Sequence, residues 1–421
     1  MLRLASLTAV AVTALAAATT AAETAPRRNT CAECHDEIEK SLEGDVHRAS
    51  GLSCVDCHKG DASSADPAKA MDPRRGFIGK PKGFAVASLC GGCHADIERM
   101  RAVNPRLPTD QLAQYRTSEH GKLALKGSQG VATCVSCHLA HGVRKVDDPA
   151  STAGKVKIVE TCTRCHNADY MKGRAIPTDQ LEKYKLSVHG QKRLKERDPS
   201  APACSDCHGN HGAAPPGVAA VTHVCGKCHV TQAELFEASS HAGHFEEAGV
   251  PPCTTCHNHH DILATGDEML GAGPGGTCSA CHQPGDVCDK ATASMKQGLV
   301  RLTASAERAK AALGSAERVG MDVEKATYEL TGASEAIVRA RVAVHRFSEP
   351  EFQKVIAEGT TIAGDAEKVA QAKLAEYRSR RQGLAAAAVA LLMFAGLLAL
   401  RASSLEKARP APADSSRPSD A

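Results

Sequence analysis

The chain has 421 residues, and its 51 Lys and Arg nearly balance its 48 Asp and Glu, which gives a formal net charge of +3. Aromatic residues make up only 3% of the chain, and tryptophan is absent. This is too little apolar bulk for an ordinary globular core of several hundred residues, so the composition argues against one.

The first residues have the three-part pattern of a secretory signal peptide. Arg3 is followed by an apolar run from Leu4 to about Ala18 and by small residues around Thr20–Ala22. We expect residues 1–22 to be a signal peptide that is removed. A short uncleaved anchor is the alternative interpretation of the same pattern.

Nine copies of the pentapeptide Cys-x-x-Cys-His lie between residues 31 and 282 and use eighteen of the nineteen cysteines. The two thiols of such a motif form thioethers with one haem, and the adjacent imidazole binds its iron. A zinc site would need two Cys-x-x-Cys pairs per metal, and a disulfide framework would not place a histidine after every second cysteine. We therefore predict nine covalently bound haem c groups. The predicted attachment sites are Cys31, Cys34, Cys54, Cys57, Cys90, Cys93, Cys134, Cys137, Cys162, Cys165, Cys204, Cys207, Cys225, Cys228, Cys253, Cys256, Cys278 and Cys281. The predicted iron ligands of the motifs are His35, His58, His94, His138, His166, His208, His229, His257 and His282.

Nine haems would supply the apolar bulk that the composition lacks. We expect residues 23–288 to form a mostly α-helical nonahaem cytochrome c domain, with extensive irregular loops wrapped around the haems. The cysteines also favour export, since c-type haem is attached outside the cytoplasm. The Lys and Arg residues between Lys122 and Arg197 would pair with haem propionates, so we expect no nucleic-acid partner.

An internal duplication covers about residues 90–141 and 162–211. The run from Leu107 to Gly121 recurs from Ile176 to Gly190, an offset of 69 residues. In each copy a haem motif is followed by a Ser-x-His element and then by a second motif with a further histidine three residues later. These extra histidines and their equivalents are the predicted second axial ligands: His47, His120, His189, His241, His141, His211 and His260.

Seven second ligands for nine irons leave two haems short. The haems of His58 and His282 have the weakest case for a second ligand, and the further candidates are His223, His244 and His259. His345 is expected to be a surface histidine of a helix, and Met71, Met100, Met171 and Met269 are expected to be packing residues. Two imidazoles on one iron close it to substrate and leave only its redox change. No catalytic residue is assigned.

The chain changes character after the ninth motif. From Leu299 to Val344 small and apolar residues recur every three or four positions, which predicts one long helix. Ser348–Glu351 forms a capping box that begins a second helix. We expect residues 289–383 to form a long antiparallel helical hairpin, packed within one chain or serving to join two copies in a homo-oligomer. Cys288, the odd cysteine, is expected to be a free thiol or to form an intermolecular disulfide.

Residues 384–400 are apolar and uncharged and are followed at once by Arg401, so we expect residues 384–401 to form one transmembrane helix. Basic residues flank both ends of this segment and do not orient it. The signal peptide does, because it places the haem domain outside the cytoplasm and leaves residues 402–421 as a polar cytoplasmic tail.

By these motifs residues 31–282 resemble the multihaem c-type cytochromes of the cytochrome c3 type, with doubled Cys-x-x-Cys-His motifs. The resemblance implies low-potential haems with two histidine ligands each, arranged in pairs, that pass electrons in the periplasm of anaerobically respiring bacteria. A weaker likeness is to the octahaem hydroxylamine oxidoreductase and tetrathionate reductase group, whose members are enzymes with one open haem.

We therefore expect an electron carrier, not an enzyme. It would be anchored in the inner membrane with its haem domain in the periplasm. It would take electrons from a quinol-oxidising or other membrane partner and deliver them to a periplasmic or outer-membrane acceptor during anaerobic respiration. The alternative is a reductase or oxidase of a small nitrogen or sulfur compound at one open haem.

Overall fold

The computed structural model describes residues 29–408, and it confirms a mostly helical fold. These residues contain no β-strand. The chain divides into two compact units, residues 1–181 with 197–215 and residues 182–196 with 216–421. The predicted signal peptide and most of the predicted polar tail lie outside the described residues.

Short helices joined by loops make up the first unit. They are α1 (Thr30–Cys34), α2 (Asp36–Ser41), α3 (Val46–Ala49), α4 (Cys54–His58), α5 (Pro67–Ala70), η1 (Pro73–Arg75), α6 (Phe84–His94), α7 (Ile97–Val103), α8 (Gln111–Thr117), α9 (Glu119–Leu125), α10 (Cys134–His138), α11 (Ile158–Thr163) and α14 (Cys204–His208).

The second unit begins with similar short helices and continues into long ones. The short ones are α12 (Gln180–Leu186), whose first two residues belong to the first unit, α13 (Val188–Gly190), η2 (Gln191–Lys195), η3 (Val218–Ala220), α15 (Val221–Gly226), α16 (Val230–Glu237), α17 (Ser240–Ala248), α18 (Pro252–His257), η4 (Asp267–Met269), η5 (Thr277–Ala280) and η6 (Val344–Arg346). The long ones are α19 (Val287–Arg318), α20 (Glu324–Ala343) and α21 (Glu349–Lys407).

Each haem motif lies on, or directly follows, a helical turn. One turn brings the two cysteines, three residues apart, onto one face and places the histidine next to them. In α4 the turn begins with a capping box, in which Asp56 accepts a hydrogen bond from the backbone N–H of Ser53 at 2.7 Å. In α14 Asp206 accepts from the N–H of Ala203 at 2.8 Å. Local sequence alone therefore builds these turns.

The residue that directly follows the second motif of each pair has a positive backbone φ. The backbone angle φ is 61° at Lys59, 69° at Leu139, 75° at Gly209 and 61° at Asn258. A non-glycine residue in this region costs roughly 1 kcal/mol or more, so the surrounding structure must impose it. After three of these four residues, Leu139, Gly209 and Asn258, a further histidine follows two positions later.

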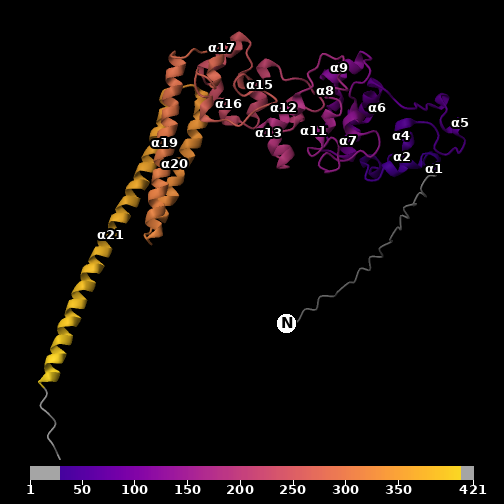
Figure 1. Cartoon of the computed structure of the whole chain (residues 1–421). Coiled ribbons are helices and arrows are strands. Elements are labelled where there is room, and N and C mark those ends of the chain that lie inside the picture. Colours follow the sequence, from indigo (N-terminus) through magenta and orange to yellow (C-terminus); the bar gives the residue numbers. More distant parts are fainter. Residues whose placement is uncertain (1–28, 409–421) are drawn as a thin grey trace, which may run out of the picture. The chain divides into compact units, whose positions relative to one another are not determined.

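The C-terminal helices form a three-helix arrangement, in which α19, α20 and α21 lie side by side (Figure 1). Their shared core includes Leu302, Leu313, Leu330 and Phe352, all buried. The expected single helix from Leu299 to Val344 is wrong. Gly320, at φ 79°, ends the first helix, and the chain turns back on itself before α20 begins.

Small residues let these three helices approach closely. At Gly359 in α21, an added Cβ atom would lie 2.6 Å from the Cβ atom of Ala336 and 2.9 Å from Leu302 Cδ1. At Gly364, on the same helix, an added Cβ atom would meet nothing within 4 Å. The two glycines therefore separate the effect of packing from that of helix propensity.

The last part of α21 is long and apolar enough to cross a membrane, and none of its most apolar window is buried in the structure. Leu384 is 73% exposed, Phe394 61% and Leu400 70%. Such a continuous apolar surface is stable when lipid or another protein covers it. Its position agrees with the transmembrane segment expected at residues 384–401.

Candidate haem-binding sites

Seven pairs of facing imidazoles are the main feature of the structure. Each pair joins the histidine of a haem motif to a histidine outside the motifs. The pairs, with the distance between ring centroids, are His47 with His94 (6.0 Å), His58 with His141 (6.1 Å), His120 with His166 (6.1 Å), His138 with His211 (6.1 Å), His189 with His229 (6.2 Å), His241 with His282 (6.2 Å) and His257 with His345 (6.1 Å).

This spacing fits a haem iron between the two rings. A metal–imidazole bond of about 2 Å places a ring centroid about 3 Å from the metal, so two rings on one iron lie about 6 Å apart. Direct packing of two imidazoles gives a shorter distance, as with the neighbouring rings of His259 and His260 at 4.7 Å. The repeated value near 6 Å therefore matches ligation better than ring packing.

The protonation state of these imidazoles also suits metal binding. Burial lowers the pKa of nine of them, which are His94, His120, His138, His141, His166, His189, His211, His241 and His257. In most pairs the facing imidazole is a further cause, since two positive charges repel. A lowered pKa keeps the ring neutral, and the neutral ring is the form that binds a metal.

The Ser-x-His elements are held by local hydrogen bonds. Ser118 is fully buried, and its Oγ accepts from the N–H of Gly121 at 2.9 Å and donates to the carbonyl of Tyr115 at 2.6 Å. Gly121 must be glycine here, because an added Cβ atom would lie 1.8 Å from that same carbonyl oxygen. The sequence Ser-x-His-Gly is therefore a positioning motif for the histidine.

Its second copy repeats this geometry. Ser187 accepts from the N–H of Gly190 at 2.9 Å, and a Cβ atom on Gly190 would lie 1.8 Å from the carbonyl oxygen of Tyr184. In the related element before the second haem motif, Asp45 takes the place of the serine. Asp45 is 3% exposed, and its carboxylate accepts hydrogen bonds from the N–H of His47 at 2.7 Å and from the N–H of Val143 at 2.7 Å. The Asp45 pKa is lowered by these backbone hydrogen bonds, which outweigh the opposing effect of burial.

One backbone hydrogen bond recurs three times and sets the register between repeats. The N–H before each positioned histidine donates to the carbonyl two residues after a trailing histidine. The bonds are Val46 to Val143 (2.8 Å), Glu119 to Ala213 (3.3 Å) and Val188 to Ile262 (2.8 Å). The acceptors follow His141, His211 and His260, so these three elements each lie against the residues that follow a later motif.

The attachment cysteines lie in pairs as well. The first thiols of consecutive motifs are neighbours, as Cys31 with Cys54, Cys90 with Cys134, Cys162 with Cys204, and Cys225 with Cys253. The adjacent Cys134 thiol and then burial raise the pKa of Cys90, and Cys204 and burial do the same for Cys162.

The second cysteines connect one pair to the next. Burial raises the pKa of Cys57, and the nearby charges of Asp56 and Cys93 raise it further. Burial likewise raises the pKa of Cys256, and the nearby Cys278 adds to it. Adjacent motifs therefore hold their attachment points close together.

Two expectations from the sequence are wrong. The haems of His58 and His282 were expected to have the weakest case for a second ligand, but His141 and His241 face them. His345 was expected at the surface, yet it is partly buried and faces His257. Its Nδ1 lies 2.9 Å from the carbonyl oxygen of Val342, which leaves Nε2 as the nitrogen available to bind a metal.

The remaining histidines outside the motifs are less well placed to act as second haem ligands. His223 and His244 are exposed, and His244 lies 3.9 Å from Glu247. His259 is exposed and contacts His260. The ligand role of His260 stays a prediction, and so does the identity of the second ligand of the His208 haem.

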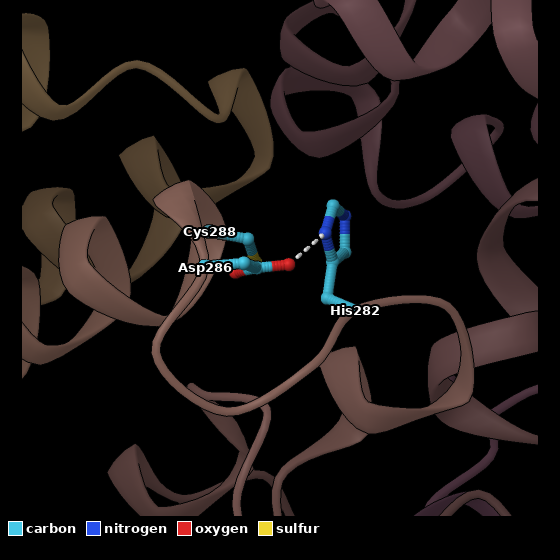
Figure 2. Close-up of side chains that lie close together, drawn as sticks. All are labelled: His282, Asp286 and Cys288. Atoms are coloured by element: carbon cyan, nitrogen blue, oxygen red, sulfur yellow. Dashed lines mark hydrogen bonds and ion pairs between the residues drawn. The ribbon is translucent and has the colours of Figure 1, made fainter.

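Figure 2 shows His282, Asp286 and Cys288, whose ligand atoms lie within 4.8 Å of one another. The His282 Nδ1 lies 3.1 Å from an Asp286 carboxylate oxygen, so this carboxylate orients a motif histidine. Burial and then the neighbouring Cys278 raise the pKa of Cys288 to about 12. We attribute the cluster to the ninth haem motif and not to a separate metal site.

A comparison with protein families found one match. Residues 46–167, which contain four of the Cys-x-x-Cys-His motifs, match the model of the cytochrome c3 family. No curated protein and no solved structure matches the chain. The match supports a multihaem c-type cytochrome of the cytochrome c3 type over residues 46–167, and that family binds haem c covalently.

Proposed function

We propose that the chain is a membrane-anchored periplasmic nonahaem cytochrome that relays electrons in anaerobic respiration. A quinol-linked membrane protein would be its donor, and a periplasmic or outer-membrane protein its acceptor. Residues 1–22 would be the signal peptide, residues 23–288 the haem domain and residues 384–401 the anchor.

The seven facing imidazole pairs are the observation that carries this proposal. A bound haem c supplies one-electron oxidation and reduction. The two imidazoles of each of these seven pairs would hold one haem iron and exclude oxygen and substrate from it. Such a site exchanges electrons and performs no bond chemistry.

Adjacent attachment sites support transfer along the chain. The neighbouring thiols within and between motif pairs keep successive haem groups close together, from Cys31 to Cys165 in the first unit and from Cys225 to Cys278 in the second. A relay needs this continuity, whereas a store of haem does not.

The C-terminal helix supports a membrane donor. A single exposed apolar helix anchors a protein but offers no pocket for a quinone, so we expect a second protein to oxidise the quinol. The arginines on both sides of the segment are compatible with either orientation. Haem attachment outside the cytoplasm requires the haem domain to be periplasmic.

Reduction in native membranes tests this function. Membranes that contain the full chain should reduce its haems on addition of a quinol, and the purified chain in detergent should not. A variant that ends after Gln382 should escape reduction by losing contact with the donor, while dithionite still reduces it fully. Quinol reduction of the purified chain alone would refute the need for a partner, and no reduction in membranes would refute the donor.

A second candidate function is a reductase or oxidase of a small nitrogen or sulfur compound. It would need one iron without a second protein ligand. His35 favours this candidate, because its ring faces no other imidazole among residues 29–408.

A further inference from the structure

His35 is a motif histidine in an exposed position. It lies between α1 and α2, with φ −113° and ψ 50°, and its side chain is exposed. Seven other motif histidines face a second imidazole near 6 Å, and in the described part of the chain His35 contacts none.

The first compact unit has no histidine left for His35. Residues 1–181 and 197–215 hold four histidines outside the motifs, and each already faces another motif histidine. These four are His47, His120, His141 and His211.

The register of the repeats gives the same result. The histidine of a Ser-x-His element or its equivalent follows one motif and faces the histidine of the second motif after that one. His47 follows the first motif and faces His94 of the third, and His120 follows the third motif and faces His166 of the fifth. For His35 this element would precede Cys31, and residues 1–30 contain no histidine.

Methionine is the other common haem ligand among side chains. In the first unit Met100 is 8% exposed and Met171 is 7% exposed, so both are packed inside the protein. Met71 is 41% exposed and follows α5, whose last carbonyl, that of Ala70, accepts a hydrogen bond from Asp61. Met71 is therefore the methionine to exclude by experiment.

We propose that the haem attached at Cys31 and Cys34 has a sixth coordination position that no side chain of this protein fills, and that this position binds a small neutral ligand. Carbon monoxide, nitric oxide and uncharged amines belong to that class. Binding forms one coordinate bond to the iron, and no electron is transferred. The inference rests on the haem attachment proposed above.

Local charge selects neutral ligands over anions. Between residues 31 and 45 there are six acidic residues and one lysine. Lys40 pairs with Asp36 at 2.9 Å and Arg48 pairs with Glu39, so these two acids are neutralised; Glu37, two residues from His35, is exposed. Negative charges within about 10 Å weaken the binding of anions such as cyanide or nitrite and leave neutral ligands unaffected.

Titration with carbon monoxide tests the proposal on the full chain in detergent. A pyridine haemochrome assay gives the haem content, and the dithionite-reduced protein is titrated with carbon monoxide by difference spectroscopy. We expect nine haems and one carbon monoxide per chain, together with one high-spin ferric haem in electron paramagnetic resonance. Nine haems with no bound carbon monoxide would overturn the open position and leave the relay intact. A proteolytic peptide of the protein in which Cys31 and Cys34 carry no haem would overturn both the open coordination position and the nonahaem relay.

Variants locate the binding position. The double variant Cys31→Ala, Cys34→Ala should lose carbon monoxide binding, and retained binding would overturn the proposal. Met71→Leu should change nothing, whereas binding that appears only in this variant would identify Met71 as the ligand and refute an open position.

A charge variant keeps the test decisive if the cysteine variant fails to fold. Glu37→Lys should strengthen cyanide binding to the ferric protein roughly two- to fivefold and leave carbon monoxide binding unchanged. Glu307→Lys, at an exposed position of α19, is the matched control and should change neither. Equal cyanide affinity in both variants would place the open iron away from His35.

Discussion

His345 is the sharpest test of the haem-ligand assignments, because no repeat in the sequence points to it. It lies in η6, at the end of α20, and its ring centroid is 6.1 Å from that of His257 with an angle of 22° between the planes. If it binds the iron of the eighth motif, the ligand bond also fastens the three-helix arrangement to that haem. His345→Ala should therefore change one haem and loosen one end of α20.

The size of the effect follows from the motif count. With one of the nine haems already high-spin in the wild type, one of the eight low-spin haems, or about 12% of the low-spin ferric signal, should become high-spin in His345→Ala. The variant should also bind one more carbon monoxide per chain than the wild type. His345→Met should instead keep the haem low-spin and raise its potential by on the order of 0.1 V, a part of the roughly 0.8 V range that axial ligands span.

Electron paramagnetic resonance and a spectroelectrochemical titration of the full chain measure both quantities. Hydrogen exchange at the end of α20 reports the loosening. His244→Ala is the matched control, since its side chain is 80% exposed and faces no motif histidine in the part of the chain that the structure describes. An unchanged low-spin count in His345→Ala would show that the pair is not a ligand pair, and the assignment of the other six would lose its geometric basis.

Gly359→Ala should lower the free energy of unfolding of the three-helix arrangement by about 1–3 kcal/mol through overpacking, whereas Gly364→Ala should raise it by about 0.5–1 kcal/mol. Thermal unfolding followed by circular dichroism measures both changes, and equal effects of the two variants would contradict the close packing at Gly359. Asp45→Ala should cost about 1–3 kcal/mol and convert part of one low-spin haem to high-spin by releasing His47, and an unchanged haem spectrum would refute the positioning role. A chain that ends after Gln382 should move from the membrane to the soluble fraction with its haem spectrum unchanged; retention in the membrane would disprove the anchor.

Local features of the site were predictable from the sequence. The cysteines three residues apart, the Ser-x-His elements and the histidines that trail a motif are all encoded within a few residues, because one helical turn and one cap position them. The same holds for the apolar end of α21. Six of the seven predicted second ligands accordingly face a motif histidine in the structure.

Long-range features were not predictable. Which imidazole faces which depends on contacts between segments tens of residues apart, such as the bond from Val143 to Asp45, and no local pattern reports them. His345 was missed for this reason. The break at Gly320 was missed because the apolar stripe continues on both sides of it, so periodicity alone does not reveal the reversal.

The register explains why both exceptions fall at the ends of the repeat series. A histidine that follows an even-numbered motif faces the motif two places earlier, as His141 does for His58 and His211 does for His138. The eighth motif would need a trailing histidine after a tenth motif, and His345 takes that place. The helical arrangement thus completes the last repeat, much as a terminal cap closes a repeat protein.

The first motif would need a Ser-x-His element before Cys31, and no residue from 1 to 30 supplies one. When every second histidine ligand comes from a neighbouring repeat, a motif near either end of the series lacks the repeat that would supply its ligand. At the eighth motif, His345 of η6 would supply the second ligand. At His35 the iron stays open, so a carrier built by this rule gains a ligand-binding haem without any dedicated catalytic residue.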